Sequence, residues 1–190
     1  MPHPDVRTIR DLLYYQYAKI LACRAFGEPD SMTAKRQHYE FIERAFRSLH
    51  DGWTPWSDIW EEGRELVEPP RRCIYCGATE GLTRGHLVPA TLHATDRCPE
   101  CEILHGPHNR VWACRRCAER KGTLGLYAFY RVLRPGDPKA HDHIPPLVEK
   151  GYLKTVHDCM ACLGRLDDRD LNRDGELSVL DIDFALAPWV

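Results

Sequence analysis

Eight of the nine cysteines in this 190-residue chain fall into four C-x-x-C pairs, and this spacing constrains the fold more than any other feature. A C-x-x-C turn can direct both sulfur atoms to one side, as a tetrahedral metal site requires. Disulfide bonding is the alternative, but this spacing favours metal binding outside secreted miniproteins. The pairs are Cys73/Cys76, Cys98/Cys101, Cys114/Cys117 and Cys159/Cys162.

The first and third pairs are predicted to form one structural zinc site. Gly77 follows the first pair and allows the backbone to turn tightly around a metal. The third pair begins a predicted helix that continues toward Tyr130, so the site would join a turn to the start of a helix. Four thiolates complete a tetrahedral Zn²⁺ site. The predicted ligands of this first zinc are Cys73, Cys76, Cys114 and Cys117.

A second structural zinc is predicted from the other two pairs, which supply four more thiolates. It would attach the C-terminal part of the chain to the central loop, and His105 or His157 can replace one cysteine. A redox pair is the alternative, although no βαβ pattern of the thioredoxin kind surrounds these cysteines. The predicted ligands are Cys98, Cys101, Cys159 and Cys162.

Positive charge is concentrated on the cysteine-rich centre, although the formal net charge of the chain is only −2. Residues 71–134 carry 11 Lys and Arg against 5 Asp and Glu, whereas residues 1–70 and 135–190 are acidic. Basic side chains bind nucleic acid by neutralising phosphates and releasing counterions. The centre is therefore predicted to bind phosphates, with an ordinary solvated surface as the alternative.

Helical spacing of apolar residues organises the first third of the chain. One helix is predicted from Asp5 to Gly27, and a second from Met32, with Ser31 as its N-cap, to about Leu49. The predicted buried face of the second helix consists of Tyr39, Ile42, Ala45, Phe46 and Leu49.

A shorter third helix is predicted between Thr54 and the break at Pro69-Pro70. Aromatic residues in this part can stack on bases, but their helical spacing favours packing in the core. Cys23 is interpreted as a small buried apolar residue. The aromatic residues assigned to the core include Tyr14, Tyr15, Trp53 and Trp60.

These patterns predict an α+β, mainly helical protein with three parts. Residues 1–70 form a helical N-terminal scaffold, residues 71–134 a zinc-stapled module, and residues 135–190 a helical C-terminal extension with a helix near 147–156. The first residues lack the apolar core of a signal peptide, and no apolar run approaches the roughly 20 residues that span a bilayer. We therefore expect a cytoplasmic protein that has no membrane partner.

The residues around the first zinc pairs follow a specific order. A His-x-x-Pro motif, from His86 to Pro89, lies between the pairs, Asn109 stands five residues before the second pair, and Lys121-Gly122 follow it. Over about fifty residues, this order resembles the HNH endonucleases. The resemblance implies that residues 71–134 form a ββα-metal (HNH) module that hydrolyses phosphodiester bonds in DNA.

The resemblance also implies roles for individual residues. His86 matches the general base that activates the attacking water, and Asn109 matches the residue that orients this histidine. Mg²⁺ or another divalent cation would stabilise the phosphate and the leaving oxygen. The basic residues expected to hold the nucleic-acid backbone are Arg84, Arg110, Arg115, Arg116, Arg120 and Lys121.

The chain departs from the family pattern at the ligands of the catalytic cation. The positions where family members carry these ligands are Gly85, Ala118 and Gly122, which have no ligand atom in their side chains. This departure leaves open whether the chain is an enzyme, and a catalytically degenerate HNH module that binds nucleic acid without cleaving it is the alternative. Other candidate ligands are Glu119, His93, His105 and His108.

The C-terminal segment 170–181 has the spacing of a calcium-binding loop and resembles one dockerin repeat. If it binds Ca²⁺, the chain can also be an adaptor that docks a protein partner through this tail. The alternative is a hydrogen-bonded turn followed by a helix with Ser178 as N-cap. The candidate calcium ligands are Asp170, Asn172, Asp174, Glu176 and Asp181, with Gly175 at the turn.

Overall fold

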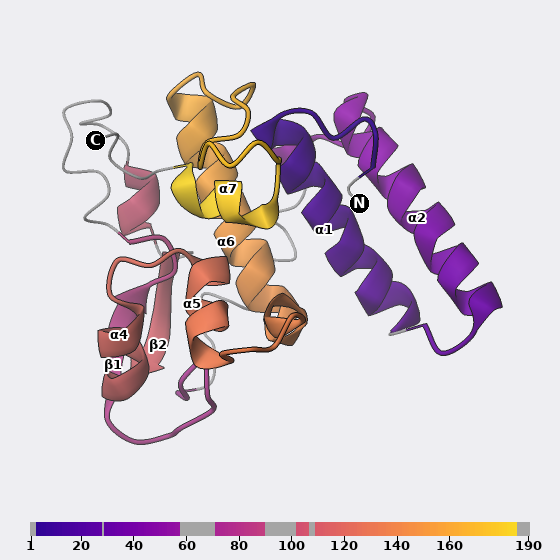
Figure 1. Ribbon diagram of the computed structural model, residues 1–190. Helices are drawn as coiled ribbons and strands as arrows, with labels where there is room; N and C mark the ends of the chain where they lie inside the picture. Colours follow the sequence, from indigo (N-terminus) through magenta and orange to yellow (C-terminus); the bar gives the residue numbers. More distant parts are fainter. Residues whose placement is uncertain (1–2, 28, 58–70, 90–101, 107–108, 186–190) are drawn as a thin grey trace.

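The computed structural model describes the whole chain except residues 1–2, 28, 58–70, 90–101, 107–108 and 186–190 (Figure 1). Helices dominate the described part, whose one sheet has two antiparallel strands, so the predicted α+β, mainly helical class is confirmed. The elements are α1 (Ile9–Phe26), α2 (Met32–His50), β1 (Leu82–His86), η3 (Glu102–His105), β2 (Arg110–Cys114), α4 (Arg115–Lys121), α5 (Leu126–Leu133), η5 (Ala140–His143), α6 (Pro146–Cys162) and α7 (Val179–Phe184).

The first two helices are present as predicted, and each has a side-chain cap at its start. Thr8 and Asp11 form a capping box at α1, in which each side chain accepts a hydrogen bond from the backbone N–H of the other residue. Ser31 caps α2 by accepting a hydrogen bond from the Ala34 N–H at 3.1 Å. The two helices pack against each other as a hairpin at one side of the molecule (Figure 1).

Three side chains of this N-terminal part are more exposed than predicted. Tyr39 is 50% exposed and Trp53 is 82% exposed, so neither belongs to the core. Cys23 is also exposed, and its Sγ lies 3.7 Å from Nε2 of His38. Periodicity identifies one face of a helix but not how far a neighbour covers it, and α2 buries side chains only in its C-terminal half. The predicted third helix falls largely on 58–70, outside the described residues.

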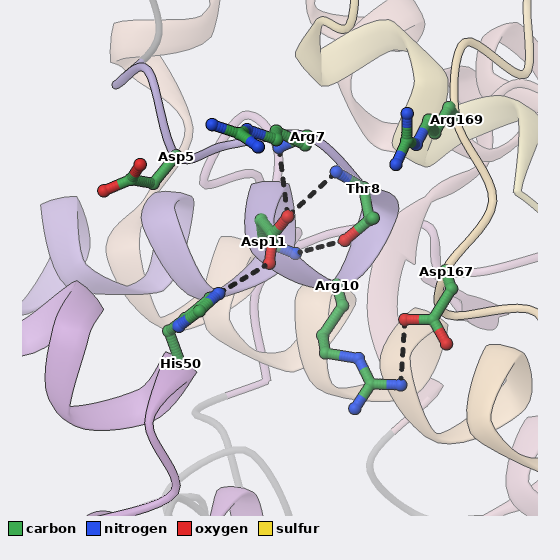
Figure 2. Close-up of a pocket in the computed structure, with 8 residues that line it drawn as sticks. All are labelled: Asp5, Arg7, Thr8, Arg10, Asp11, His50, Asp167 and Arg169. Carbon is green, nitrogen blue, oxygen red and sulfur yellow. Dashed lines mark hydrogen bonds and ion pairs between the residues drawn. The ribbon is translucent and has the colours of Figure 1, made fainter.

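The start of α1 is held by the C-terminal extension. The first N–H groups of a helix lack partners within the helix. Here the Ile9 N–H donates to the Asp168 carbonyl at 2.9 Å. The Arg10 N–H donates to the Leu166 carbonyl at 2.9 Å, and the Arg10 guanidinium pairs with Asp167 at 3.1 Å (Figure 2). The N-terminal and C-terminal segments are therefore in direct contact.

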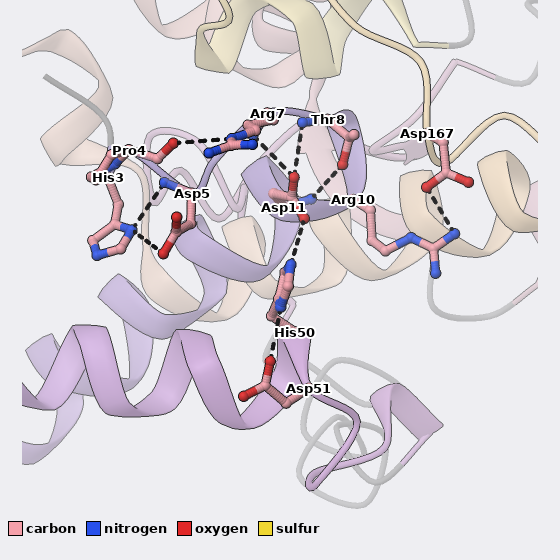
Figure 3. A network of polar contacts seen from close by, with 10 residues as sticks. All are labelled: His3, Pro4, Asp5, Arg7, Thr8, Arg10, Asp11, His50, Asp51 and Asp167. Carbon is pink, nitrogen blue, oxygen red and sulfur yellow. Dashed lines mark hydrogen bonds and ion pairs between the residues drawn. The ribbon is translucent and has the colours of Figure 1, made fainter.

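A cavity of about 550 Å³ lies beside this contact (Figure 2). Asp11 accepts hydrogen bonds from the backbone N–H groups of Arg7 and Thr8, at 3.0 and 2.9 Å. It also faces Nε2 of His50, at 3.7 Å (Figure 3). Arginine and aspartate side chains compensate each other around it, so the cavity, which lies where the start of α1 meets the end of α2 and the loop after α6, is not a site of one charge. Its lining consists of Asp5, Arg7, Thr8, Arg10, Asp11, His50, Asp167 and Arg169.

The two strands present one face that is rich in basic and aromatic side chains. His86 lies opposite Arg110, and Arg84 lies opposite Trp112. Because side chains alternate between the faces of a strand, these four share one face, whereas Val111 points to the other face and is buried. α4 begins directly after β2, which gives the order strand, strand, helix.

The helix predicted from Cys114 to Tyr130 is two helices in the structure. Gly122, with φ of 47°, ends α4 in the left-handed conformation that favours glycine. A turn follows, in which the Leu124 N–H donates to the Lys121 carbonyl at 2.8 Å, and α5 then begins. The prediction of one continuous helix was therefore wrong. Apolar residues recur at helical spacing through this segment, but Gly122 ends the first helix.

α6 lies between the α1–α2 hairpin and the sheet (Figure 1). It extends to Cys162, beyond the predicted end near Val156, so Cys159 lies in its last turn rather than after it. Side chains of α6 such as Leu153 belong to a hydrophobic cluster that includes residues from all three predicted parts of the chain. Within the described residues, no helix is both long enough and apolar enough to cross a bilayer.

α7 caps α5 from a distant position in the sequence. The N-cap of α5 is Gly125, so the helix has no capping side chain of its own. The Asp183 carboxylate accepts hydrogen bonds from the N–H groups of Tyr127 and Ala128, at 3.3 and 2.7 Å. It also accepts one from the Tyr152 hydroxyl, at 2.8 Å. One carboxylate thus joins α5, α6 and α7.

Two carboxylic acids in this region have raised pKa values. Burial raises the pKa of Asp183 from 3.8 to about 6, although its hydrogen-bond donors oppose the shift. Burial also raises the pKa of Glu149, which accepts a 2.7 Å hydrogen bond from the Tyr127 hydroxyl, from 4.5 to about 6. Both groups therefore bind a proton more readily in the folded state than in the unfolded state.

Gly125→Ala is expected to lower the free energy of unfolding by about 1–3 kcal/mol, because the added methyl group would collide with the Asp183 side chain. Gly85→Ala is the matched control. Its added carbon would meet Ala113 at an ordinary 4.0 Å, so a change below about 0.5 kcal/mol is expected. Urea unfolding measures both values. Equal stability of the two variants would contradict the packing of α7 on α5.

Protonation of Glu149 and Asp183 is expected to raise the free energy of unfolding as the pH falls from 7 to 5. Their folded pKa values of about 6 exceed the unfolded values of 4.5 and 3.8, so this stabilisation is complete at low pH and is lost as the pH rises through about 6. In the double variant Glu149→Gln, Asp183→Asn, the change between these pH values should be smaller by about 1–3 kcal/mol. Denaturant titrations at both pH values measure it, and equal pH dependence of the two proteins would refute the assignment.

Candidate metal centre and the surroundings of His86

The structure brings the first and third cysteine pairs together, as the sequence predicts. Their four sulfur atoms all lie within 4.8 Å of one another, and Sγ of Cys76 is 3.7 Å from Sγ of Cys114. Among the described residues, this is the only group of three or more Cys, His, Asp or Glu side chains arranged to hold a metal ion. Its members are Cys73, Cys76, Cys114 and Cys117.

A tight turn positions the first two sulfur atoms. The Gly77 N–H donates to the Cys73 carbonyl at 2.8 Å, and Gly77 adopts φ of 77°. The Cys73 N–H donates to the Ala78 carbonyl at 2.7 Å, which closes the turn. The Ile74 N–H then donates to the Trp112 carbonyl at 2.9 Å. The turn is therefore attached to β2, the strand that leads into the second pair.

The electrostatics of the cluster suit a bound cation. Burial raises the pKa of the Cys73 thiol, but hydrogen bonds from backbone N–H groups outweigh this effect and bring its pKa down to about 7. Burial and the neighbouring sulfur atoms raise the pKa of Cys117 far above its ordinary value. A metal ion at the centre would compensate both the burial and the repulsion between thiolates. The four cysteines can therefore hold a metal ion.

The second predicted zinc site is only half described. Cys98 and Cys101 lie outside the described residues. Cys159 is buried and Cys162 is exposed, and both lie in the last turn of α6 rather than in a loop. The second zinc remains a prediction.

His86 lies at the end of β1, in positive surroundings. Its Nε2 is buried and has no hydrogen-bond partner among the described residues. Its ring centroid lies 6.4 Å from that of His105. Burial lowers the pKa of His86, and the nearby positive groups Arg110, His105 and Lys121 lower it further. These surroundings therefore favour the neutral form of the imidazole.

Asn109 is fully buried and braces the chain directly after His86. Its side-chain oxygen accepts a hydrogen bond from the Val88 N–H at 2.7 Å, and its amide donates to the Val88 carbonyl at 2.8 Å. The same amide donates to the Leu104 carbonyl at 2.8 Å, and the Asn109 carbonyl accepts from the Leu87 N–H. This one side chain thus connects the end of β1 to η3.

The described surroundings of His86 offer few ligands for a catalytic cation. Gly85 lies on β1 and Ala118 on α4, and neither has a ligand atom in its side chain. Of the other candidates, Glu119 is paired with Arg115 at 2.7 Å, and His105 is the one described histidine beside His86. His93 and His108 lie outside the described residues.

The predicted phosphate-binding residues differ in how available they are. Lys121 is a correction to the prediction, because only 4% of it is exposed and its ammonium donates to the Leu124 carbonyl at 3.0 Å. The Arg120 guanidinium donates to the Val132 carbonyl at 3.0 Å, and Arg115 pairs with Glu119. The remaining three, Arg84, Arg110 and Arg116, are exposed.

The sequence did not identify Trp112 and Arg71 as neighbours of the predicted phosphate-binding residue Arg84. The Arg84 guanidinium carbon lies 4.1 Å from the centroid of the Trp112 ring, and that of Arg71 lies 5.7 Å from it. The signal for Trp112 was its position two residues after Arg110 in a short alternating strand. The contact itself depends on strand register, which the sequence does not reveal.

The C-terminal loop forms the turn and capped helix that were the alternative to a calcium site. The buried Asp181 carboxylate accepts hydrogen bonds from the N–H groups of Ser178 and Asn172, at 2.7 and 3.1 Å, and Ser178 caps α7. Asp170 accepts hydrogen bonds from the N–H groups of Asp174 and Gly175, at 3.0 and 3.1 Å. Binding of Ca²⁺ by this loop stays a prediction.

Comparison with known proteins found no match for this chain, whether among family models, curated proteins or solved structures. The resemblance to the HNH endonucleases therefore depends on the motif residues alone.

We expect purified protein to contain one metal ion at the four-cysteine cluster, measured by inductively coupled plasma mass spectrometry. Cys76→Ser together with Cys117→Ser should abolish this binding and lower the melting temperature, because binding energy at a structural site is folding energy. Cys23→Ser is the control, since Cys23 lies on α1 outside the cluster. Full metal content in the double variant would refute the site, and a second equivalent in the wild type would support the other predicted zinc.

Proposed function

We propose that the chain binds nucleic acid through a zinc-stapled module of the HNH type, with a phosphate held beside His86. The positive surroundings of His86 carry this proposal. Arg110 and Lys121 disfavour a proton on its ring, and the same charges attract an anion. A phosphate is the anion that nucleic acids present, and the basic composition of residues 71–134 extends the attraction beyond this point.

Zinc is the metal proposed for the four-cysteine cluster. Four thiolates in a tetrahedral arrangement are the usual donor set for structural Zn²⁺, which has no geometric preference of its own. A closed set of four protein ligands leaves no position for water or substrate, so this zinc would stabilise the fold rather than take part in a reaction. The same mass spectrometry that counts the metal identifies it.

Hydrolysis of the bound phosphodiester is a second candidate function. Two features support it: burial and nearby positive charge lower the pKa of His86, which favours the form that can accept a proton from water, and Asn109 fixes the chain beside it. A divalent cation such as Mg²⁺ would stabilise the charge on the phosphate. The described residues do not fit this cation, however, because Gly85 and Ala118 supply no ligand and the surroundings of His86 are positive. Binding is therefore the primary proposal.

Two assays separate binding from cleavage. Fluorescence anisotropy with a labelled DNA duplex is expected to show binding that weakens steeply between about 50 and 200 mM salt. Incubation of supercoiled plasmid with Mg²⁺, Mn²⁺ or Ni²⁺ tests for nicking, which the His86→Ala variant should lack. Binding without nicking supports the primary proposal alone, and nicking that depends on His86 supports both. Absence of binding at low salt would contradict the proposal.

A gain-of-function variant tests the missing ligands. Gly85→Asp with Ala118→Asn adds a carboxylate and an amide oxygen, and position 85 has room for a side chain. Nicking should appear or increase in this variant if the remaining geometry is competent. Gly85→Ala with Ala118→Leu is the control, because it adds carbon atoms without ligands. Equal nicking in both variants would show that the added oxygen atoms have no role.

A further inference from the structure

An arginine stacked on a tryptophan marks the outer face of the sheet. The guanidinium of Arg84 lies over the Trp112 ring at 4.1 Å, and Arg71 approaches the same ring at 5.7 Å. Trp112 is half-buried, whereas both arginines are exposed. Stacking restricts the plane of a guanidinium but leaves its N–H donors pointing outward in that plane, available to an acceptor. The Trp112 ring therefore restricts where the Arg84 guanidinium can lie, and the exposed side chain keeps N–H donors accessible to a ligand.

This stacked pair continues into the surroundings of His86. The pairs Arg84/Trp112 and His86/Arg110 are neighbours on the same face, two residues apart along each strand, which corresponds to about 7 Å. Arg71 adds a further positive group near the same Trp112 ring. These five residues, Arg71, Arg84, Trp112, Arg110 and His86, are named the sheet-face row.

The arginines of the sheet-face row are not engaged by carboxylates. Within the part of the chain that the structure describes, no ion pair involves Arg71, Arg84 or Arg110. Arg115, on the neighbouring α4, is by contrast paired with Glu119. The row thus presents three positive groups to solvent, at the side of the module that also contains His86.

We infer that the sheet-face row is the surface along which the phosphodiester backbone of the nucleic acid lies, leading to His86. This inference rests on the proposed function and adds where and how the nucleic acid is held. Guanidinium groups cover the Trp112 ring, so the row contacts phosphates rather than stacking on bases. Binding is therefore independent of base sequence, and the row accepts single strands as well as duplexes.

The test compares variants by fluorescence anisotropy with a labelled 30-nucleotide DNA, as a single strand and as a duplex, over a range of salt concentrations. Arg84→Ala should weaken binding to both by about tenfold and reduce the slope of log affinity against log salt by about 1. Trp112→Leu keeps every charge, so it should weaken binding by about threefold without changing the slope. Trp112→Phe, which keeps a ring under Arg84, should restore most of the loss.

Arg36→Ala is the matched control, because it removes the same charge from an exposed position on α2 and should bind as the wild type does. Circular dichroism and metal content confirm that each variant is folded. If the wild type binds DNA but Arg71→Ala and Arg84→Ala have the same affinity and the same salt dependence, the sheet-face row is not the binding surface and the proposed function stands. If the wild type does not bind DNA, both fail. Tighter binding of a polyglutamate peptide than of DNA would assign the row to an acidic protein and overturn the inference.

Discussion

The four sulfur atoms that lie within 4.8 Å of one another join the turn before β1 to the point where β2 ends and α4 begins. The central module depends on this junction, because it determines where the sheet starts. Cys114 pairs with Leu82, the first residue of β1, so the antiparallel register then carries the chain to His86 at the other end of the strand. The buried side chain of Asn109 secures that other end through three hydrogen bonds. The two five-residue strands are thus fixed in position at both ends of the sheet.

The two ends of the sheet differ in charge and therefore in the ligand that they suit. At one end, buried thiols that repel each other as thiolates favour a cation. At the other, His86 has positive neighbours and an unpartnered Nε2 among the described residues, which favours an anion. Gly85 and Ala118 strengthen this contrast, because a carboxylate at either position would have reduced the positive field. The electrostatics of the module consequently separate a cluster that can hold a metal ion from the face that we propose binds phosphate.

The helices around the module are held together by polar contacts between distant segments as well as by the shared core. The carbonyls of Leu166 and Asp168 serve the first N–H groups of α1, and Asp183 serves those of α5. In both cases the C-terminal extension supplies hydrogen-bond acceptors for the first N–H groups of a helix, which have no partners within the helix itself. The raised pKa of Asp183 shows that this arrangement has a cost, since a charged group is withdrawn from water.

Features that depend on residues close together in the chain were predictable from the sequence. Ser31 and Ser178 indicated helix starts, because a cap acts over three or four residues. The C-x-x-C pairs indicated a metal cluster although 38 residues separate Cys76 from Cys114, because two such pairs supply the four thiolates of one tetrahedral site. The burial and the contacts of individual side chains, which depend on how distant segments pack, were not predictable. The exposure of Trp53, the burial of Lys121 and the stacking of Arg84 on Trp112 were decided by the tertiary structure alone. The physical reason is that a side chain's own chemistry determines what it can bind, whereas its burial and partners depend on which surface the rest of the chain places against it.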